Sequence, residues 1–258
     1  MTKTELFRSL HHGDRPLVLP NAWDYGSAAM LAEAGFAALG TTSLGVAAAA
    51  GLPDGTAATR DETLALARRL GRLPVPVTVD VEGGFSDDAG EVAEFCAELA
   101  GAGIAGINLE DSRSNAELAD PREHGALIAA VKAATPELFV NARTDTYWLG
   151  IDGDSTLERV QHYEKCGADG IFVPGVTDPE RIRALAAALT VPLNILFSPA
   201  GATVAELGAL GVRRISTGSL LYRAALAAAV HTAESVAHGQ QLVAEIPSYA
   251  TIQRLLEG

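Results

Sequence analysis

The chain has 258 residues, 48% of them hydrophobic, and 32 acidic side chains against 19 basic ones give a formal net charge of −13 at pH 7. This composition predicts a packed globular protein and excludes intrinsic disorder. The acidic balance argues against nucleic acid or an anionic membrane surface as a partner, because both bind basic patches. No apolar run suits a membrane span or a signal peptide, and Cys96 and Cys166 show no metal or disulfide spacing. We therefore expect a reduced, cytoplasmic protein.

Short β-rich runs alternate with longer amphipathic segments rich in Ala, Leu and Glu along the chain. Strands are predicted at 17–20, 37–43, 75–82, 106–111, 138–145, 170–175, 193–197 and 214–219. Helices are predicted between them at 24–34, 61–71, 88–101, 121–134, 154–166, 178–189, 202–209 and 219–236. Eight such units predict an α/β fold of the (β/α)₈ TIM-barrel type. An open doubly wound sheet is the alternative, but no G-x-G-x-x-G motif follows the first strand.

A faint internal repeat supports a single domain. Segments 34–40, 101–107, 165–171 and 209–215 each read as a helix end, a glycine and an apolar strand. Glycine at these corners predicts a left-handed helix cap. We therefore expect one domain over 1–258, with its core at about 15–236 and a short C-terminal helix at 246–258. Residues 44–60 are predicted to form a long loop, and 111–120 a polar loop; loops of such length are often functional.

Two carboxylates follow the third predicted strand, in VPVTVDVEGGF. Residues two apart on a strand share a face, so Asp80 and Glu82 are predicted to project together near its carboxyl end. Two like charges side by side are costly unless a cation or a proton neutralises them. The next strand ends in Glu110 and Asp111. Acidic side chains at two successive strand ends predict a hard metal ion held by oxygen ligands.

Six motifs stand in order, each at the end of a predicted strand or in the loop that follows one. They are LPNAWD (19–24), GTTS (40–43), GLPDG (51–55), DVEGGF (80–85), GINLED (106–111) and NARTD (141–145). This pattern resembles that of the isocitrate lyase/phosphoenolpyruvate mutase superfamily, over roughly residues 15–235. The resemblance implies a barrel that binds Mg²⁺, with Mn²⁺ as an alternative, together with a 2-oxo acid or its enolate.

The resemblance also implies roles for acidic and basic side chains. Asp80 matches a direct metal ligand, and Glu82 and Glu110 match ligands that act through metal-bound waters. Arg143 matches a catalytic arginine that pairs with the substrate's oxygens. The simpler alternative for Arg143 is an ion pair with Glu110 or with Asp145. Asp54 matches a catalytic acid on a mobile loop, against the alternative of a plain Pro-Asp-Gly turn.

Substrate binding is implied at two further strand ends. Ser43, together with Thr42, matches the position whose hydroxyl and neighbouring amides hold the substrate carboxylate. Gly45 would allow the backbone to approach the substrate closely. Asn194 is a candidate for a hydrogen bond to the distal end of the substrate, with a structural role as the alternative.

The loop after the fourth predicted strand departs from the family pattern. Lyases of the family carry a Lys-Lys/Arg-Cys-Gly-His loop there, and the mutases carry a Lys and an Asn. This chain reads DSRSNAELADPREHG, without Cys or Lys. Only Arg113, Asn115 and His124 are candidates to replace those groups. Asp120-Pro121 predicts the start of a helix, which would make His124 a surface residue one turn into it.

These features predict a Mg²⁺-dependent, lyase-like enzyme. We expect it to cleave a C–C bond of a small 2-oxo acid or hydroxy di- or tricarboxylate, by retro-aldol chemistry or decarboxylation, through a metal-stabilised enolate. One alternative is a phosphonate enzyme acting on a P–C bond, and another is a non-catalytic oxo-acid binder that lost its catalytic acid. The family resemblance also implies a homodimer or homotetramer.

Overall fold

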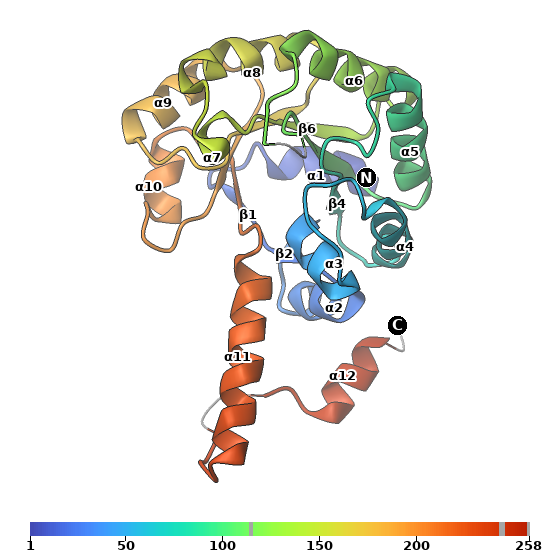
Figure 1. Ribbon diagram of the computed structural model, residues 1–258, viewed down its shortest axis with the longest axis vertical. Helices are drawn as coiled ribbons and strands as arrows, with labels where there is room; N and C mark the ends of the chain where they lie inside the picture. Colours follow the sequence, from blue (N-terminus) through green and yellow to red (C-terminus); the bar gives the residue numbers. More distant parts are fainter. Residues whose placement is uncertain (114–115, 243–245, 257–258) are drawn as a thin grey trace.

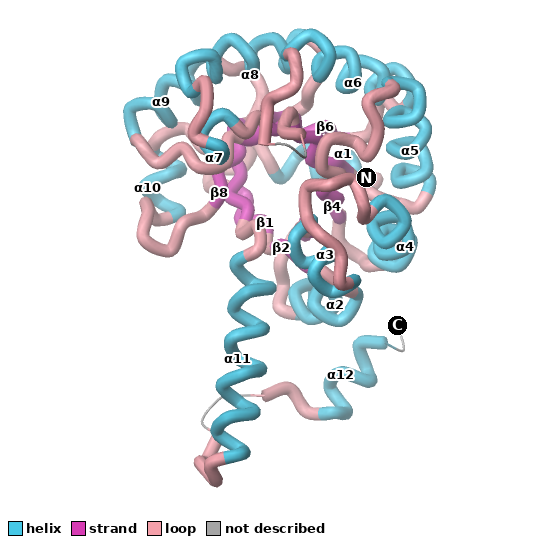
Figure 2. Tube along the Cα trace, viewed as in Figure 1, coloured by secondary structure: helices cyan, strands magenta, loops and turns pink. Residues whose placement is uncertain are grey.

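The computed structural model describes residues 1–113, 116–242 and 246–256. Within them, one sheet of parallel strands runs in the order β1-β9-β8-β7-β6-β5-β4-β3-β2. The strands are β1 (Leu17–Leu19), β2 (Asn21–Ala22), β3 (Leu39–Thr41), β4 (Val77–Asp80), β5 (Gly106–Glu110), β6 (Phe139–Arg143), β7 (Gly170–Phe172), β8 (Leu193–Leu196) and β9 (Arg214–Ser216). Figure 2 shows these strands enclosed by helices, and the predicted TIM-type barrel is confirmed.

The barrel closes at a break in its first strand. β1 pairs with β9, whereas β2 pairs with β3, and Pro20 stands between the two pieces. Proline has no N–H to give to a sheet ladder, but its carbonyl accepts a bond from Gly40 N–H at 2.9 Å. β1 and β2 therefore act as one strand that changes neighbour, which reconciles nine observed strands within the described residues with eight predicted units.

Helices cover most of the outside of the barrel, and the last two of the described chain lie outside the compact body (Figure 1). The helices are α1 (Lys3–Leu10), α2 (Tyr25–Glu33), α3 (Ser43–Ala50), α4 (Arg60–Leu70), α5 (Ala89–Gly101), α6 (Pro121–Ala134), α7 (Thr146–Leu149), α8 (Thr156–Lys165), α9 (Pro179–Ala188), α10 (Val204–Ala209), α11 (Leu220–Ala237) and α12 (Tyr249–Leu256), with a 3₁₀ turn η1 (Gly153–Ser155). The prediction of a loop over all of 44–60 is wrong, because α3 occupies its first part. Its run of alanines favours a helix, and Gly51 ends it with a φ of 72°.

The repeated corners between helices and strands form as predicted. The glycines at these corners all take left-handed backbone angles, with φ of 90°, 90°, 104° and 95° at Gly35, Gly103, Gly167 and Gly211. A side chain is strained in this conformation, whereas glycine adopts it freely. The same turn therefore returns the chain to the amino end of the sheet four times.

The two faces of each strand differ in character. Outward side chains such as Val79, Ile107 and Val140 are fully buried in the core between sheet and helices. A smaller apolar cluster around Phe7 of α1 and Phe139 closes the amino end of the barrel. Inward positions nearer the carboxyl end are polar. They comprise Thr78, Asn108, Asn141, Asn194 and Arg214, each 3% exposed or less.

The C-terminal helices stand apart from this compact body. α11 extends away from the barrel, and α12 returns beside α2 (Figure 1), where Arg254 lies 3.4 Å from Glu33. Three large apolar side chains of α11, Leu226, Val230 and Val236, are 50%, 59% and 64% exposed. In the described part of the chain, no helix combines the length and apolarity that a membrane span requires.

His124 lies in the interior. α6 begins as predicted, with Asp120 accepting a capping bond from Arg122 N–H at 2.7 Å. The predicted surface position of His124 is nevertheless wrong, because the helix turns that face toward the barrel. Its ring is 0% exposed and meets the edge of Tyr163, with 4.8 Å between ring centroids. Burial lowers the pKa of His124 to about 3.

This burial predicts a pH-dependent contribution to stability. The unfolded chain protonates His124 near pH 6.5 and the folded chain only near pH 3, so stability is lost as pH falls through that window. We expect the stability of His124→Phe relative to wild type to rise by about 2 kcal/mol between pH 7.5 and pH 5. Thermal unfolding at both pH values measures this difference. His12→Gln, at an exposed position, is the control, and an unchanged difference for His124→Phe would contradict the assignment.

Candidate active site

A cavity of about 320 Å³ lies at the carboxyl ends of the barrel strands. Of the residues predicted from the sequence, Thr42, Ser43, Asp54, Asp80, Glu110 and Arg143 line it. The other three, Gly45, Glu82 and Asn194, do not. Apolar side chains also line the cavity, among them Leu44, Trp148, Phe172 and Leu196. The cavity is thus large enough for a small organic acid and presents both charged and apolar groups to it.

Asp80 occupies the end of β4. Its N–H donates to Thr41 Oγ1 at 2.9 Å, which fixes the backbone, and its Oδ2 lies 3.4 Å from the N–H of Ser43. Its Oδ1 is buried and has no hydrogen-bond partner in the described residues. Burial raises the pKa of Asp80 to about 6, against the lowering effect of Arg143. A buried carboxylate oxygen without a donor is costly and fits a bound cation.

The amino end of α3 faces Asp80. Thr42 is the N-cap residue but makes no side-chain capping bond, and the helix begins at Ser43. The free N–H groups and the positive end of the helix dipole make this a natural place for a carboxylate. Gly45 lies behind the wall instead, where a Cβ would come within 2.7 Å of Trp23 Cβ. Glycine is required there for helix packing.

Arg143 joins two acidic groups. Its Nε and Nη2 donate to the two oxygens of Asp145 at 2.6 and 2.9 Å, and its Nη1 lies 2.6 Å from Glu110 Oε2. Burial opposes the positive charge, but Glu110, Asp145 and Asp80 outweigh it and hold the pKa of Arg143 above its usual range. For the carboxyl group of Glu110, burial acts in the other direction and raises the pKa. Both ion pairs considered for Arg143 therefore form, and its planar fork is fixed in one orientation.

Glu82 lies beyond the end of β4, with a φ of 50°. It does not share a strand face with Asp80 as the sequence predicted. Its two oxygens accept bonds from Ala57 N–H at 2.9 Å and Thr59 Oγ1 at 2.8 Å. Glu82 therefore anchors the loop that brings Asp54 to the cavity. It also lines an adjoining hollow of about 200 Å³ together with Glu110.

Asn194 points to a neighbouring strand. It exchanges hydrogen bonds with Ser216 of β9, with heavy-atom distances of 2.9 and 3.1 Å. Ser216 lines the cavity, whereas Asn194 lies behind it. The arrangement matches the structural alternative for Asn194.

The polar loop after β5 supplies one cation to the cavity. Arg113 lines the rim, where its Nη1 donates to Ser112 O at 3.1 Å and its Nε lies 3.4 Å from Asp87. Asn115 lies outside the described residues. His124 does not reach the cavity, and no Cys, His, Lys or Tyr is among the described residues that line it. The Cys and Lys that the family resemblance implied for this loop do not occur in its sequence, DSRSNAELADPREHG.

Several lining residues were not singled out from the sequence, and Asn108 is the one that pairs with Asp80 on the neighbouring strand. Asn108 lies two positions before Glu110 on β5, and both line the cavity. The period-two pattern of the strand was the available signal. Asp111, next to Glu110, faces outward. It accepts bonds from Thr144 Oγ1, Asp145 N–H and Tyr163 OH at 2.8, 2.9 and 2.8 Å.

The charges of the site fit a divalent cation. Asp80, Glu110 and Asp145 surround the guanidinium of Arg143. With Asp54, the described acidic side chains that line the cavity outnumber its arginines, Arg113 and Arg143. No three His, Cys, Asp or Glu side chains converge as a ready cluster in the described ranges. Mg²⁺ does not need such a cluster, because it keeps several of its waters. Asp80 would hold the ion, with Glu110 and Glu82 further out.

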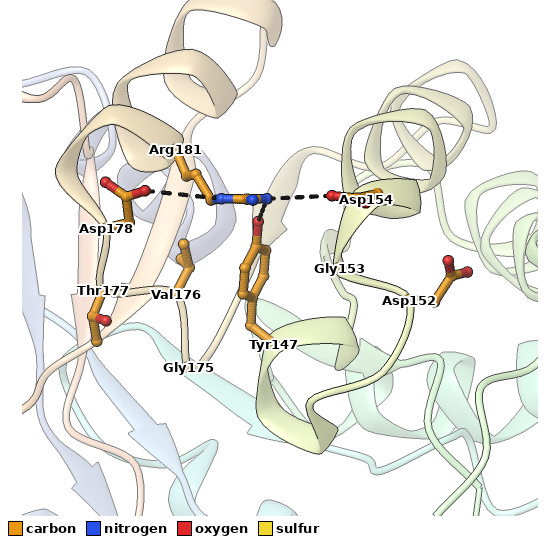
Figure 3. A pocket seen from close by; sticks show the side chains of 9 residues that line it. All are labelled: Tyr147, Asp152, Gly153, Asp154, Gly175, Val176, Thr177, Asp178 and Arg181. Atoms are coloured by element: carbon orange, nitrogen blue, oxygen red, sulfur yellow. Dashed lines mark hydrogen bonds and ion pairs between the residues drawn. The ribbon is translucent and has the colours of Figure 1, made fainter.

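A second hollow, of about 460 Å³, lies beside α7 and α9 (Figure 3). The guanidinium of Arg181, the cation of this hollow, is already engaged by neighbouring side chains. Its Nη1 donates to Tyr147 OH at 2.9 Å, and it lies 3.7 and 3.8 Å from Asp154 and Asp178. The charge of Arg181 is thus already compensated. Unlike the cavity at the strand ends, this hollow has no buried polar side-chain atom without a partner among its described residues.

Comparisons with known proteins agree with this architecture. The model of the phosphoenolpyruvate phosphomutase family matches residues 7–237. An uncharacterized protein of Mycobacterium tuberculosis is 48% identical over 97% of this chain and 95% of its own length. An oxaloacetate decarboxylase of Pseudomonas aeruginosa is 34% identical over 86% of this chain and 81% of its own. A structure of phosphonopyruvate hydrolase with oxalate and Mg²⁺ has a TM-score of 0.88 at 25% identity, covering 100% of this chain and 95% of that one.

Replacing Asp80 by asparagine tests the metal site. We expect Asp80→Asn to abolish Mg²⁺ binding in titration calorimetry. We also expect the metal-free variant to melt above the wild type at pH 8, because the folded state resists ionising Asp80 up to about pH 6. A gain of 1 kcal/mol corresponds to roughly 2–4 °C for a chain of this size. Asp61→Asn, at a 90% exposed side chain, is the control. Wild-type Mg²⁺ affinity in Asp80→Asn would remove Asp80 from the site.

Proposed function

The chain belongs to the isocitrate lyase/phosphoenolpyruvate mutase superfamily, and we propose that it is a cytoplasmic, Mg²⁺-dependent lyase. Its substrate in this proposal is a small 2-oxo acid or hydroxy acid, in which it cleaves a C–C bond. The observation that carries the proposal is the buried, unpartnered Oδ1 of Asp80 beside the excess of carboxylates. A cation there would allow an anionic substrate to enter an otherwise negative cavity.

The residues of the cavity have distinct parts in this reaction. When bound, Mg²⁺ supplies a Lewis-acid charge for the oxygen on which negative charge develops. The N–H of Ser43 donates to Asp80 Oδ2, and the other N–H groups in the first turn of α3 hold and orient the substrate carboxylate. Arg143, fixed by Asp145 and Glu110, adds preorganised positive charge. Trp148, which is 56% exposed, and Leu44 give the cavity apolar lining.

Decarboxylation is the C–C cleavage that these residues support best. A retro-aldol reaction needs a base for the substrate hydroxyl and usually an acid for the leaving carbanion. In a 2-oxo diacid, the C–C bond electrons pass to the enolate as CO₂ leaves, so the cleavage itself requires no proton transfer, and the released enolate then takes a proton from water to give the 2-oxo acid. The described lining offers no Cys, His, Lys or Tyr as an acid. The similarity to an oxaloacetate decarboxylase supports the same reaction type.

Phosphonate chemistry is supported less well by the charges. Arg113 and Arg143 are the cations among the described lining residues. Arg143 already pairs with Glu110 and Asp145, and Arg113 with Asp87. A phosphonate would add negative charge without an uncommitted cation to receive it.

A substrate panel tests this proposal. With Mg²⁺ present, we expect oxalate at a hundred times its Kd to add about 2.7 kcal/mol of stability, or roughly 5–10 °C. We expect pyruvate to form from oxaloacetate and no phosphate to be released from phosphonopyruvate. Thermal shift and product detection measure these outcomes, with EDTA as the control. Phosphate release would favour the P–C reaction, and oxalate binding without any product would favour a non-catalytic binder.

We also propose a homodimer or homotetramer. The exposed apolar side chains of α11, among them Leu226 and Val230, support this proposal because such a row is unfavourable in water. We expect light scattering after size exclusion to give a mass of two or four chains. Leu226→Glu with Val230→Glu should lower it to one chain, while Arg183→Glu, on an exposed helix face, should not. A monomeric wild type would contradict the proposal.

A further inference from the structure

Asn108 lies in the floor of the cavity between the acidic groups of the site. Asn108 lies on β5, where it pairs with Asp80 on the neighbouring strand β4 and with Asn141 on the other neighbouring strand, β6. Glu110 follows two residues later on the same face of the strand. Asn108 lines the cavity although it is only 3% exposed.

The orientation of the Asn108 carboxamide is fixed by two donors. Its Oδ1 accepts bonds from Asn141 Nδ2 at 2.9 Å and from Arg214 Nη2 at 3.0 Å. A guanidinium can only donate, so the atom that faces Arg214 must be the oxygen. The Nδ2 of Asn108 then points away from both donors. This Nδ2 has no acceptor in the described ranges. It is also absent from the set of fully buried polar atoms without a partner, so it is accessible from the cavity that Asn108 lines.

Arg214 has few described partners for a buried charge. It is 1% exposed, no carboxylate of the described residues lies within 4.0 Å of it, and its Nε and Nη1 have no partner there. Burying a charge in this way is expensive, and an apolar side chain of similar volume would serve packing as well or better. Among the described residues, its side-chain hydrogen bond goes to Asn108, the ring of Phe7 lies 5.8 Å away, and the charge of Asp80 attracts it from beyond ion-pair distance.

We infer that Asn108 is a substrate-binding residue, whose Nδ2 donates to an oxygen of the bound acid, and that Arg214 is the positioning residue that holds it. The inference rests on the proposed function and defines the substrate end at the cavity floor as an acceptor, such as a carboxylate or carbonyl oxygen. Without Arg214, the carboxamide is free to turn. Its Oδ1 would then face the substrate beside Asp80 and Glu110, and it would repel an anion.

Oxalate binding tests the role of Asn108. With Mg²⁺ present, we expect Asn108→Ala to bind oxalate at least roughly tenfold more weakly in titration calorimetry, the effect of losing a hydrogen bond to a charged group. Its affinity for Mg²⁺ alone should not change. The matched control is Thr78→Val, an equally buried inward position that does not line the cavity. It should bind oxalate like the wild type.

The outcomes separate this inference from the proposed function. Failure of the wild type to bind oxalate with Mg²⁺ would overturn both. Equal binding by the wild type and Asn108→Ala would overturn the inference and leave the proposed function standing.

Two replacements of Arg214 test positioning against a purely structural role. We expect Arg214→Met to weaken oxalate binding roughly three- to tenfold without lowering the melting temperature, because a buried charge is removed. Arg214→Lys keeps a donor for Asn108 Oδ1 and should restore most of the affinity. Wild-type oxalate affinity in Arg214→Met would overturn the positioning role, as would equal losses in both variants.

Discussion

An excess of buried negative charge is the constraint around which the carboxyl end of the barrel is built. Asp80, Glu110 and Asp145 lie around the guanidinium of Arg143, the charge of Arg214 also acts on Asp80, and Asp80 Oδ1 has no partner in the described chain. The surroundings are arranged to tolerate this charge. Arg143 is clamped from two sides, and the amino end of α3 turns its positive dipole toward Asp80. These features suit the site to a cation and an anionic ligand.

Much of this site follows from the period of the strands. Parallel strands end at one edge of the sheet, so the positions of Asp80, Glu110 and Arg143 in the sequence suffice to bring them together. The strand period does not predict the position of Glu82, because its backbone leaves the strand with a positive φ and its carboxylate accepts hydrogen bonds from residues 57 and 59. The burial of His124 depends on the rotation of α6 about its axis. The sequence left both a substrate-binding and a structural role open for Asn194. Its partner, Ser216, and the side chain of Trp23 next to Gly45 are neighbours that no local pattern reveals.

The neighbours Glu110 and Asp111 divide the work of the β5 end between two sides of the sheet. Glu110 faces the cavity and pairs with Arg143, whereas Asp111 faces the helices and accepts a bond from the N–H of Asp145. Arg159 of α8 also lies 3.3 Å from Asp111. The position of Asp145, and through it the orientation of Arg143, is thus tied to the outer helical layer. A substitution on α8 would therefore alter the orientation of Arg143 although α8 does not contact the site directly.

The hydrogen bonds that hold the loop after α3 limit how many residues beside the cavity are free to move. Glu82 tethers that loop at Ala57 and Thr59, so the span left untethered is short. Asp54 stands within this span between Gly51 and Gly55, whose φ angles of 72° and 68° suit them as pivots. A movement confined to the span between these two glycines would reorder few residues, so its entropic cost would be low.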